Sequence, residues 1–292
     1  MATELSLPAP AKLNLLLHIN GRRPDGYHEL QTLFQLLDHG DTLHVRRLDT
    51  QDIILESDWH EVPPEDNLIV RAARLLQHHA GCRLGAAIRL EKRLPSGGGV
   101  GGGSSDAAST LLALDALWQL DLPPNSLARL GRQLGADVPV FVLGRSAWAE
   151  GVGERLTPVI LPQWWYVVIK PPVHVSTAKI FSHPLLTRDT PKMKIAPAFE
   201  GHTAGRNDCE NVVFSLYPEV RKAYEWLSER GNARLTGTGA CVFARYENAE
   251  DAQRVLMELP KHLSGFIAQG VNRSPAHQML DNWKATNRAL PT

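Results

Sequence analysis

The sequence has little of what several common protein classes need. Its 31 basic and 31 acidic residues leave no net charge, so we expect no broad attraction to nucleic acid or to an acidic membrane. Three widely spaced cysteines, Cys82, Cys209 and Cys241, contain no Cys-x-x-Cys pair, which is typical of a reducing cytoplasm. No apolar run approaches the ~20 residues that cross a bilayer, and prolines interrupt the N-terminus where a signal peptide needs an apolar stretch. The sequence therefore predicts a cytoplasmic protein that binds neither nucleic acid nor membrane.

A glycine-rich run at residues 95–105 lacks the lysine that the commonest phosphate-binding loops carry. It reads PSGGGVGGGSS and lies between a strand-like segment, 86–94, and a helix-like segment, 104–117. Each glycine costs ~0.5–1 kcal/mol of chain entropy relative to alanine, so a folded loop with six of them needs a reason. Close approach of the backbone to an anion, near the positive end of the following helix, is the best one. A flexible linker is the alternative, but linkers rarely join a strand to a helix so tightly.

The missing lysine excludes the Walker A loop, because Gly103 is followed by Ser104 and Ser105. A dinucleotide-binding fingerprint fits almost any run this rich in glycine. It also expects an acidic residue about 20 positions later at the end of a strand, whereas residues 119–125 predict a turn before another helix. No protein-kinase motif follows the run. Such a loop needs Mg²⁺ and cations from elsewhere in the fold to neutralise a triphosphate. Ser104 and Ser105 have hydroxyls suited to phosphate oxygens or to a hard cation, and we expect one of them to cap the helix.

The apolar patterns predict an α+β chain in which strands come first, helices follow and both then return. Residues 5–20 show the alternation of a strand, and residues 38–41 predict a turn before another strand. The short apolar run 138–143 is interpreted as a strand that follows a helix at 126–134. Two prolines and little periodicity at 186–205 predict a mobile loop. This order favours two α+β layers over a doubly wound parallel sheet.

Several side chains outside the glycine run can carry chemistry. Lys12 and Asn14 are two residues apart in the first strand, so their amine and amide point the same way. Asp137 follows a predicted helix end, where a carboxylate opposes the helix dipole unless a lysine or a substrate hydroxyl compensates it. His28 lies beside Tyr27 after a turn. The simpler interpretations are that Lys12 is a snorkelling lysine, that Asp137 is a turn residue and that Tyr27 and His28 are an edge pair. No single position decides between the simple and the functional interpretation.

Three motifs in order along the chain resemble those of the GHMP kinases, the superfamily of galactokinase, homoserine kinase, mevalonate kinase and phosphomevalonate kinase. They are PAKLNL at 10–15, PSGGGVGGGSSDAA at 95–108 and LTGTGAC at 235–241, which taken alone is a glycine turn between two strands. Three further segments are RPDGYHELQT at 23–32, LGADVPVF at 134–141 and NDCE at 207–210. These resemble the branch of the superfamily that acts on 4-diphosphocytidyl-2-C-methyl-D-erythritol. The resemblance runs over residues 7–277.

The resemblance implies an α+β fold of two domains with the active site in the cleft between them. Residues 1–155 would form an N-terminal domain like domain 2 of ribosomal protein S5, and residues 156–292 a ferredoxin-like C-terminal domain. The implied activity is ATP-dependent phosphorylation of the 2-hydroxyl group of 4-diphosphocytidyl-2-C-methyl-D-erythritol in non-mevalonate isoprenoid synthesis, with Mg²⁺ as a second cofactor. The expected partner is this small molecule, and the expected assembly is a monomer or a weak homodimer.

The same resemblance assigns roles to individual residues. Lys12 and Asp137 match the catalytic pair, in which Asp137 takes the proton of the attacking alcohol and Lys12 keeps Asp137 ionised. Substrate contacts are implied at Asn14, Tyr27, His28, Thr177 and Phe181. ATP is implied over Pro95, Ser96, Gly97, Gly98, Gly99, Val100, Gly101, Gly102, Gly103, Ser104 and Ser105. The motifs do not assign the metal ligands.

Two positions depart from the family pattern, and two other functions stay open. Ser182 stands where some members carry a lysine, and Asp106 stands where others have asparagine, beside the expected phosphates. A mevalonate-type kinase is the first alternative; the tyrosine, histidine and phenylalanine named above argue against it, because a cytosine needs stacking and edge hydrogen bonds. A nucleotide-sensing relative without catalysis is the second, and retention of both catalytic residues speaks against it.

Overall fold

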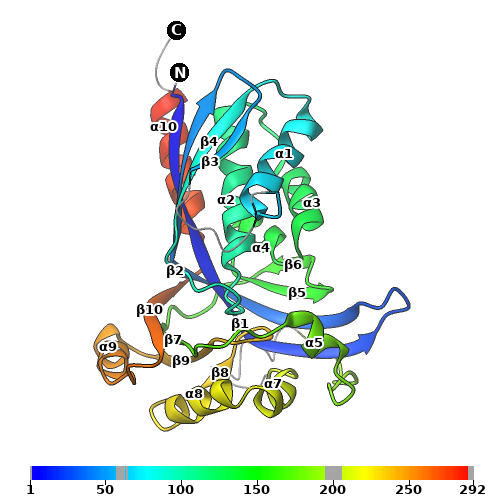
Figure 1. Ribbon diagram of the computed structural model, residues 1–292, viewed down its shortest axis with the longest axis vertical. Coiled ribbons are helices and arrows are strands. Elements are labelled where there is room, and N and C mark those ends of the chain that lie inside the picture. Colours follow the sequence, from blue (N-terminus) through cyan, green and yellow to red (C-terminus); the bar gives the residue numbers. More distant parts are fainter. Residues whose placement is uncertain (1, 57–62, 64, 195–205, 289–292) are drawn as a thin grey trace.

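A long β-hairpin forms the spine of the structure, a computed structural model that describes residues 2–56, 63, 65–194 and 206–288 (Figure 1). Its strands, β1 (Glu4–Arg22) and β2 (His28–Leu48), pair antiparallel along almost their whole length. Leu7, Leu13 and Ile19 of β1 are fully buried. The strand predicted at residues 5–20 is therefore confirmed, although residues 9–14 are buried on both faces and β-bulges interrupt the regular alternation.

The turn predicted at residues 38–41 was wrong, because β2 runs through it without a break. A Cβ on Gly40 would overlap the backbone of Ala9, so the two strands approach closely there. The carboxylate of Asp41 does not bond its own backbone, as a turn-forming aspartate does. It accepts hydrogen bonds from the amides of Arg93 and Leu94 at 2.6 and 2.7 Å. Asp41 thus ties β2 to the start of the glycine run.

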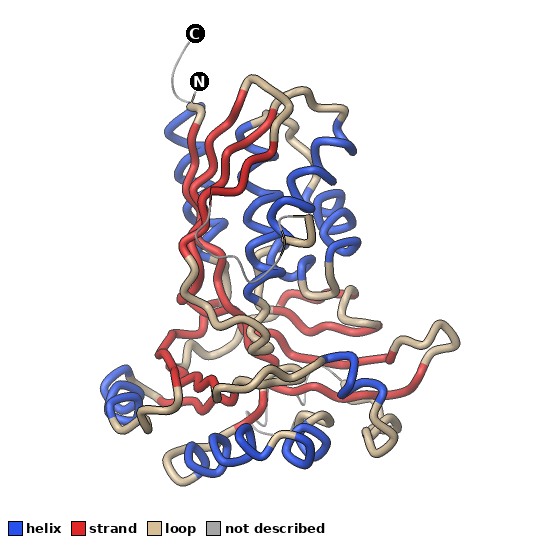
Figure 2. Tube along the Cα trace, viewed as in Figure 1, coloured by secondary structure: helices blue, strands red, loops and turns tan. Residues whose placement is uncertain are grey.

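Helices cover one side of the N-terminal part of the sheet (Figure 2). Here β4 (Gly85–Glu91) pairs antiparallel with β2, and β3 (Ile53–Glu56) pairs parallel with β4. The helices are α1 (Leu68–Ala80), α2 (Gly102–Leu117), α3 (Pro124–Leu134) and α4 (Val138–Leu143). Two short strands, β5 (Ala147–Gly151) and β6 (Arg155–Pro158), follow, and β5 pairs with β2.

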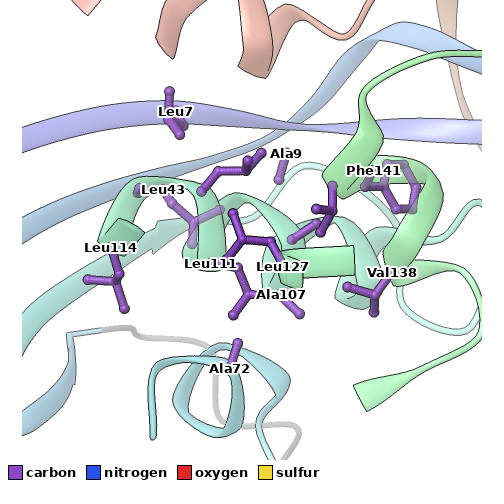
Figure 3. Packing of buried hydrophobic residues seen from close by; sticks show 14 of the residues in the cluster. Leu7, Ala9, Leu43, Ala72, Ala107, Leu111, Leu114, Leu127, Val138 and Phe141 are labelled. Carbon is purple, nitrogen blue, oxygen red and sulfur yellow. The ribbon is translucent and has the colours of Figure 1, made fainter. Parts of the chain in front are cut away.

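Helix α2 lies in the middle of this part and is buried along nearly its whole length. Its small residues let neighbouring elements approach closely, and its leucines fill the space between them. Leu111 of α2 packs in one core with Leu7 and Leu43 of the hairpin and Ala72 of α1 (Figure 3). This core holds the start of α2, and therefore the end of the glycine run, in a fixed position.

The strand predicted at residues 138–143 was wrong, because this apolar run forms helix α4. Val138 through Val142 are all buried, so neither alternation nor helical spacing marks one face. The correction changes the setting of Asp137. It follows the end of α3, whose C-terminal cap is Gly135, but it also immediately precedes the first residue of α4, where the dipole favours a carboxylate.

The C-terminal part is an antiparallel sheet with its own helices. Its strands are β7 (Trp165–Lys170), β8 (Arg234–Leu235), β9 (Val242–Tyr246) and β10 (Ser264–Val271), in the order β10-β7-β9-β8. Its helices are α5 (Thr177–Ser182), α7 (Glu210–Leu216), α8 (Pro218–Ser228) and α9 (Ala249–Met257). A short pairing of β10 with β2 joins both parts into one sheet, and α10 (Pro275–Arg288) packs against β1. The prediction of an α+β chain is confirmed, and the domain boundary at residues 155 and 156 stays a prediction.

The segment predicted as a mobile loop is only partly described. Residues 186–194 form no helix or strand, and residues 195–205 lie outside the described residues. In the described part of the chain, no helix combines the length and the apolar character that a membrane span requires.

Candidate active site

Two pockets meet beside the end of the glycine run. The Tyr27 pocket, about 550 Å³, is lined by Lys12, Asn14, Leu17, Arg22, Gly26, Tyr27, His28, Leu30, Thr32, Phe34, Gly99, Ser104, Ala136, Asp137, Val152, Gly153, Thr177, Ala178, Phe181, Ser182, Gly237 and Thr238. The glycine-loop pocket, about 600 Å³, is lined by Asp66, Asn67, Leu68, Leu90, Lys92, Pro95, Ser96, Gly97, Gly98, Gly99, Gly101, Gly102, Gly103, Ser104, Asp106, Asp137 and His174. Gly99, Ser104 and Asp137 line both. A group passed from one pocket to the other would pass these three residues.

The glycines are required by the backbone path of the run. Gly97, Gly99 and Gly101 have φ values of 62°, 75° and 77°, in the left-handed region that disfavours other residues. A Cβ on Gly99 would overlap the carbonyl oxygen of Thr236 and lie 3.0 Å from that of Gly239. The run therefore presents bare backbone to its pocket and packs tightly against the 235–241 motif on its other side.

Two side chains of the run point away from the pocket lining. Val100 is buried in the core that contains Leu13, and its carbonyl accepts a hydrogen bond from the amide of Lys12 at 2.9 Å. The hydroxyl of Ser105 is fully buried and has no hydrogen-bond partner among the described residues. Ser104, one position earlier, lines both pockets.

Lys12 and Asp137, predicted as a catalytic pair, lie in contact. The Nζ atom of Lys12 is 3.2 Å from Oδ2 of Asp137. Nζ also donates to Oδ1 of Asn14 at 2.6 Å and to the carbonyl of Gly99 at 2.9 Å, and it lies 5.4 Å from the centre of the Phe34 ring. Lys12 is only 3% exposed, whereas Asp137 is 33% exposed. The ammonium group is thus held rigidly, and the carboxylate remains open to both pockets.

Asn14 is fixed by three neighbours and leaves little freedom to Lys12. Its Nδ2 donates to the hydroxyl of Thr32 at 2.8 Å, and its backbone amide donates to the hydroxyl of Thr236 at 3.0 Å. The side chains of Lys12 and Asn14 therefore do point the same way, as their spacing in the strand predicts. Because strand, glycine run and 235–241 motif all meet here, the three family motifs form one site.

The aromatic side chains predicted for substrate contact gather at the far end of the Tyr27 pocket. Tyr27 is 62% exposed near the hairpin tip. The ring centres of His28 and Phe181 are 5.3 Å apart, and the hydroxyls of Thr177 and Thr238 are 2.9 Å apart. Burial lowers the pKa of His28, and the nearby positive charges of Arg188 and Arg22 lower it further. The imidazole is therefore neutral at physiological pH.

Lys92 is a site residue that the sequence prediction missed. Lys92 stands three residues before Pro95 in the sequence and lines the glycine-loop pocket. Its Nζ lies 2.5 Å from Oδ2 of Asp41 and 3.1 Å from Oδ2 of Asp106. This is a cation supplied from outside the run, as the missing lysine requires. It also explains the carboxylate at Asp106, which faces a lysine. Lys92 lies just outside the glycine run, and Asp41 is 51 positions away in sequence, so no local pattern marks the cluster.

The asparagine and aspartate of the NDCE segment fasten the C-terminal part to the hairpin. Nδ2 of Asn207 donates to the carbonyls of Leu235 and Gly237 at 3.0 and 2.7 Å. Oδ2 of Asp208 accepts a hydrogen bond from the amide of Ile19 at 2.7 Å. These contacts explain the segment as a support for the 235–241 motif, which in turn supports Gly99.

We expect Asp106→Asn to change how stability depends on pH. Burial and the charge of Asp41 raise the pKa of Asp106 to about 7, against the opposing effect of Lys92. Because the folded-state pKa is raised, the contribution of Asp106 to stability is full below about pH 4 and is lost as the pH rises through about 7. Asparagine does not titrate. Relative to wild type, the variant should therefore gain about 2–3 kcal/mol in unfolding free energy between pH 5 and pH 8.

Urea unfolding at these two pH values measures the effect. Asp251→Asn on α9 is the control, because Asp251 lies on an exposed helix and we expect no comparable change between the two pH values. Parallel stability curves for Asp106→Asn and wild type would contradict the raised pKa.

The comparisons with known proteins agree with this geometry. The chain matches the family model of the GHMP kinases N terminal domain over residues 67–145 and that of the GHMP kinases C terminal over residues 195–265. A Hahella chejuensis protein named 4-diphosphocytidyl-2-C-methyl-D-erythritol kinase is 55% identical over 289 residues, which cover 96% of this chain and 98% of that protein. This chain belongs to the 4-diphosphocytidyl-2-C-methyl-D-erythritol kinase family.

Further relatives of this kinase extend the likeness. A Pseudomonas paraeruginosa protein of the same name is 57% identical over 281 residues, which cover 96% of this chain and 99% of that protein. A crystal structure of 4-(cytidine 5'-diphospho)-2C-methyl-D-erythritol kinase matches with a TM-score of 0.81 at 36% identity, covering 91% of this chain and 100% of that one. The predicted GHMP kinase fold is confirmed, and this kinase is an ATP-dependent enzyme that phosphorylates a small molecule.

Proposed function

We propose that this kinase transfers the γ-phosphoryl group of ATP to the 2-hydroxyl of 4-diphosphocytidyl-2-C-methyl-D-erythritol, a step of non-mevalonate isoprenoid synthesis. The observation that carries the proposal is the Lys12–Asp137 contact at the junction of the two pockets. A phosphoryl donor in one pocket and an alcohol in the other would meet beside this carboxylate. The names of the Hahella and Pseudomonas relatives support the choice of alcohol.

In this proposal the glycine-loop pocket holds the phosphates of ATP. Backbone amides of the run and the positive N-terminal end of α2 attract the negative oxygens, and Lys92 adds a full charge. Because Asp41 and Asp106 hold the ammonium group of Lys92, it is positioned before the nucleotide binds. Most of the rate enhancement of such enzymes comes from this kind of positioning and electrostatic stabilisation.

The donor set near the phosphates fits Mg²⁺. The described residues contain no group of three acidic, histidine or cysteine side chains placed to hold a metal ion. Ser104 lines both pockets, so its hydroxyl would supply a side-chain oxygen to the ion. When bound, Mg²⁺ neutralises charge on the transferring phosphoryl group.

Asp137 accepts the proton of the substrate hydroxyl as that oxygen attacks phosphorus. An alcohol has a pKa far above neutrality, so a carboxylate within hydrogen-bond reach lowers the barrier. Lys12, whose Nζ lies 3.2 Å from Oδ2 of Asp137, stabilises the charge that develops on the attacking oxygen. Asn14, which holds Nζ of Lys12 and lines the same pocket, orients the hydroxyl group.

The Tyr27 pocket suits a substrate with an aromatic base. Tyr27, His28 and Phe181 offer ring faces and edges in the same pocket that Asp137 lines, as a substrate with both a cytosine and a reacting hydroxyl needs. Ser182, the departure from the family pattern, also lines this pocket. A mevalonate-type substrate has no base to contact these rings, so we favour the cytidylyl alcohol over that alternative.

A coupled ADP-release assay tests the proposed function. We expect kcat/KM for 4-diphosphocytidyl-2-C-methyl-D-erythritol to exceed those for mevalonate and homoserine by at least about 100-fold, because unfilled contacts to the base cost transition-state binding. Equal or greater turnover of mevalonate would point to the first alternative. Absence of ADP release with every alcohol, while ATP still binds, would point to a nucleotide-sensing protein.

A further inference from the structure

Arg188 connects the two walls of the Tyr27 pocket, although it does not line the pocket itself. It lies in the irregular segment after α5, and its guanidinium group makes four hydrogen bonds. Nε donates to Nε2 of His28 at 3.0 Å, and one terminal nitrogen donates to the carbonyl of Leu186 at 3.1 Å. The other terminal nitrogen donates to the carbonyls of Phe181 and His183 at 2.9 and 2.8 Å. One planar cation thus holds a side chain of β2 and the C-terminal end of α5 together.

The contact with His28 decides which ring nitrogen carries its proton. Arginine has only donors and stays charged, so Nε2 of His28 must act as the acceptor. A neutral imidazole that accepts at Nε2 carries its hydrogen on Nδ1. Protonation of the ring would remove this acceptor and place a second positive charge beside the guanidinium. Arg188 therefore selects one neutral tautomer of His28 as well as its position.

We propose that Arg188 is a positioning and specificity-determining residue, which sets the spacing of His28 and Phe181 and the Nδ1–H tautomer of His28 for recognition of the pyrimidine base of a nucleotide-linked alcohol. The inference rests on the proposed function for the identity of that base. Cytosine presents acceptors at O2 and N3, which match an imidazole whose free nitrogen is a donor. The ring of Phe181 is held 5.3 Å from His28 because its backbone carbonyl is tied to the same guanidinium.

Kinetics of Arg188→Met and Arg188→Lys test the positioning role. We expect KM for the cytidylyl alcohol to rise about 10- to 100-fold, with kcat within about threefold of wild type and KM for ATP unchanged. Lysine keeps the charge but cannot reproduce the planar fork, so it should not restore KM. Arg221→Met is the matched control, since Arg221 is an exposed arginine on α8 that pairs along its own helix with Glu225.

The pH dependence of kcat/KM separates the proposed role of Arg188 from a purely structural one, because a purely structural role would not shift this dependence. In wild type the burial of His28, together with the charges of Arg188 and Arg22, lowers its pKa, so kcat/KM for the cytidylyl alcohol should fall only at acid pH. Without Arg188 the pKa of His28 rises, and this acid limb should move to higher pH. Glutamine at position 28 has no group that titrates in this pH range. In the His28→Gln background, removal of Arg188 should therefore not move the acid limb.

Nitrogen-15 NMR of histidine-labelled wild-type protein tests the tautomer without substrate or turnover. The signal of His28 is identified among the 12 histidines by its absence from His28→Gln, and we expect Nδ1 to carry the hydrogen at neutral pH. A hydrogen on Nε2, or an Arg188→Met enzyme with wild-type KM and an unmoved acid limb, would overturn the proposal. If wild type fails to turn over the cytidylyl alcohol, the proposed function fails, and the NMR result still decides the tautomer. If Arg188→Met fails to fold, KM of Arg188→Lys and the nitrogen-15 spectrum of wild type still test the proposal.

Discussion

Asp137→Asn should lower kcat by about 10²- to 10⁴-fold while KM for ATP stays near its wild-type value. Asparagine keeps the shape of the side chain and its place before α4, but it cannot accept the proton of the attacking hydroxyl. ATP binding should survive, because the glycine run and Lys92 do not depend on the carboxylate of Asp137. Steady-state ADP release at saturating alcohol measures kcat, and titration of the variant with ATP measures nucleotide affinity.

The setting of Asp137 makes this test specific. Lys12 keeps its hydrogen bonds to Asn14 and to the carbonyl of Gly99, so loss of the ion pair should not release the ammonium group. Asp251→Asn, an exposed aspartate on α9, controls for the general effect of removing one negative charge. A kcat within about threefold of wild type would remove Asp137 from the role of general base and leave positioning as the main source of catalysis.

Gly99→Ala should be the most damaging single change in the glycine run. Its φ of 75° is strained for alanine, and the new Cβ would overlap the carbonyl of Thr236 and approach that of Gly239. Both obstacles are backbone atoms, which cannot rotate away as a flexible side chain can. We expect a loss of more than about 2 kcal/mol in unfolding free energy, or a displaced run with a strongly raised KM for ATP.

Gly103→Ala is the matched control for Gly99→Ala. It lies in the same run but has no left-handed φ, and its added Cβ would meet only the end of Leu68 at 3.5 Å, an ordinary contact. Thermal unfolding and ATP titration of both variants separate the two positions. Equal stability and equal nucleotide affinity for both would show that the close packing of Gly99 against the 235–241 motif is not needed.

Some predicted site residues have roles that follow from their neighbours in the sequence, and others have roles that depend on contacts with distant segments. Lys12 and Asn14 were placed side by side from the strand period alone, and their 2.6 Å hydrogen bond agrees. Asp137 was picked out because it follows a helix end, and α3 does end at Leu134. It precedes α4, and its importance comes from contact with Lys12, 125 positions earlier in the chain. Only the family resemblance linked these two residues before the fold was known.

The sequence by itself determined the features that depend on neighbouring residues. The presence of strand β1 follows from the apolar alternation in residues 5–20, although the structure buries both of its faces over residues 9–14. The path of the glycine run follows from φ values that only glycine adopts freely. Tertiary structure decided the rest. The run at 138–143 became a helix because burial on every side leaves no period to read. Asp41 reaches Lys92 across 51 positions and Arg188 reaches His28 across 160, and such contacts leave no local pattern because their energy is gained only when distant segments pack together.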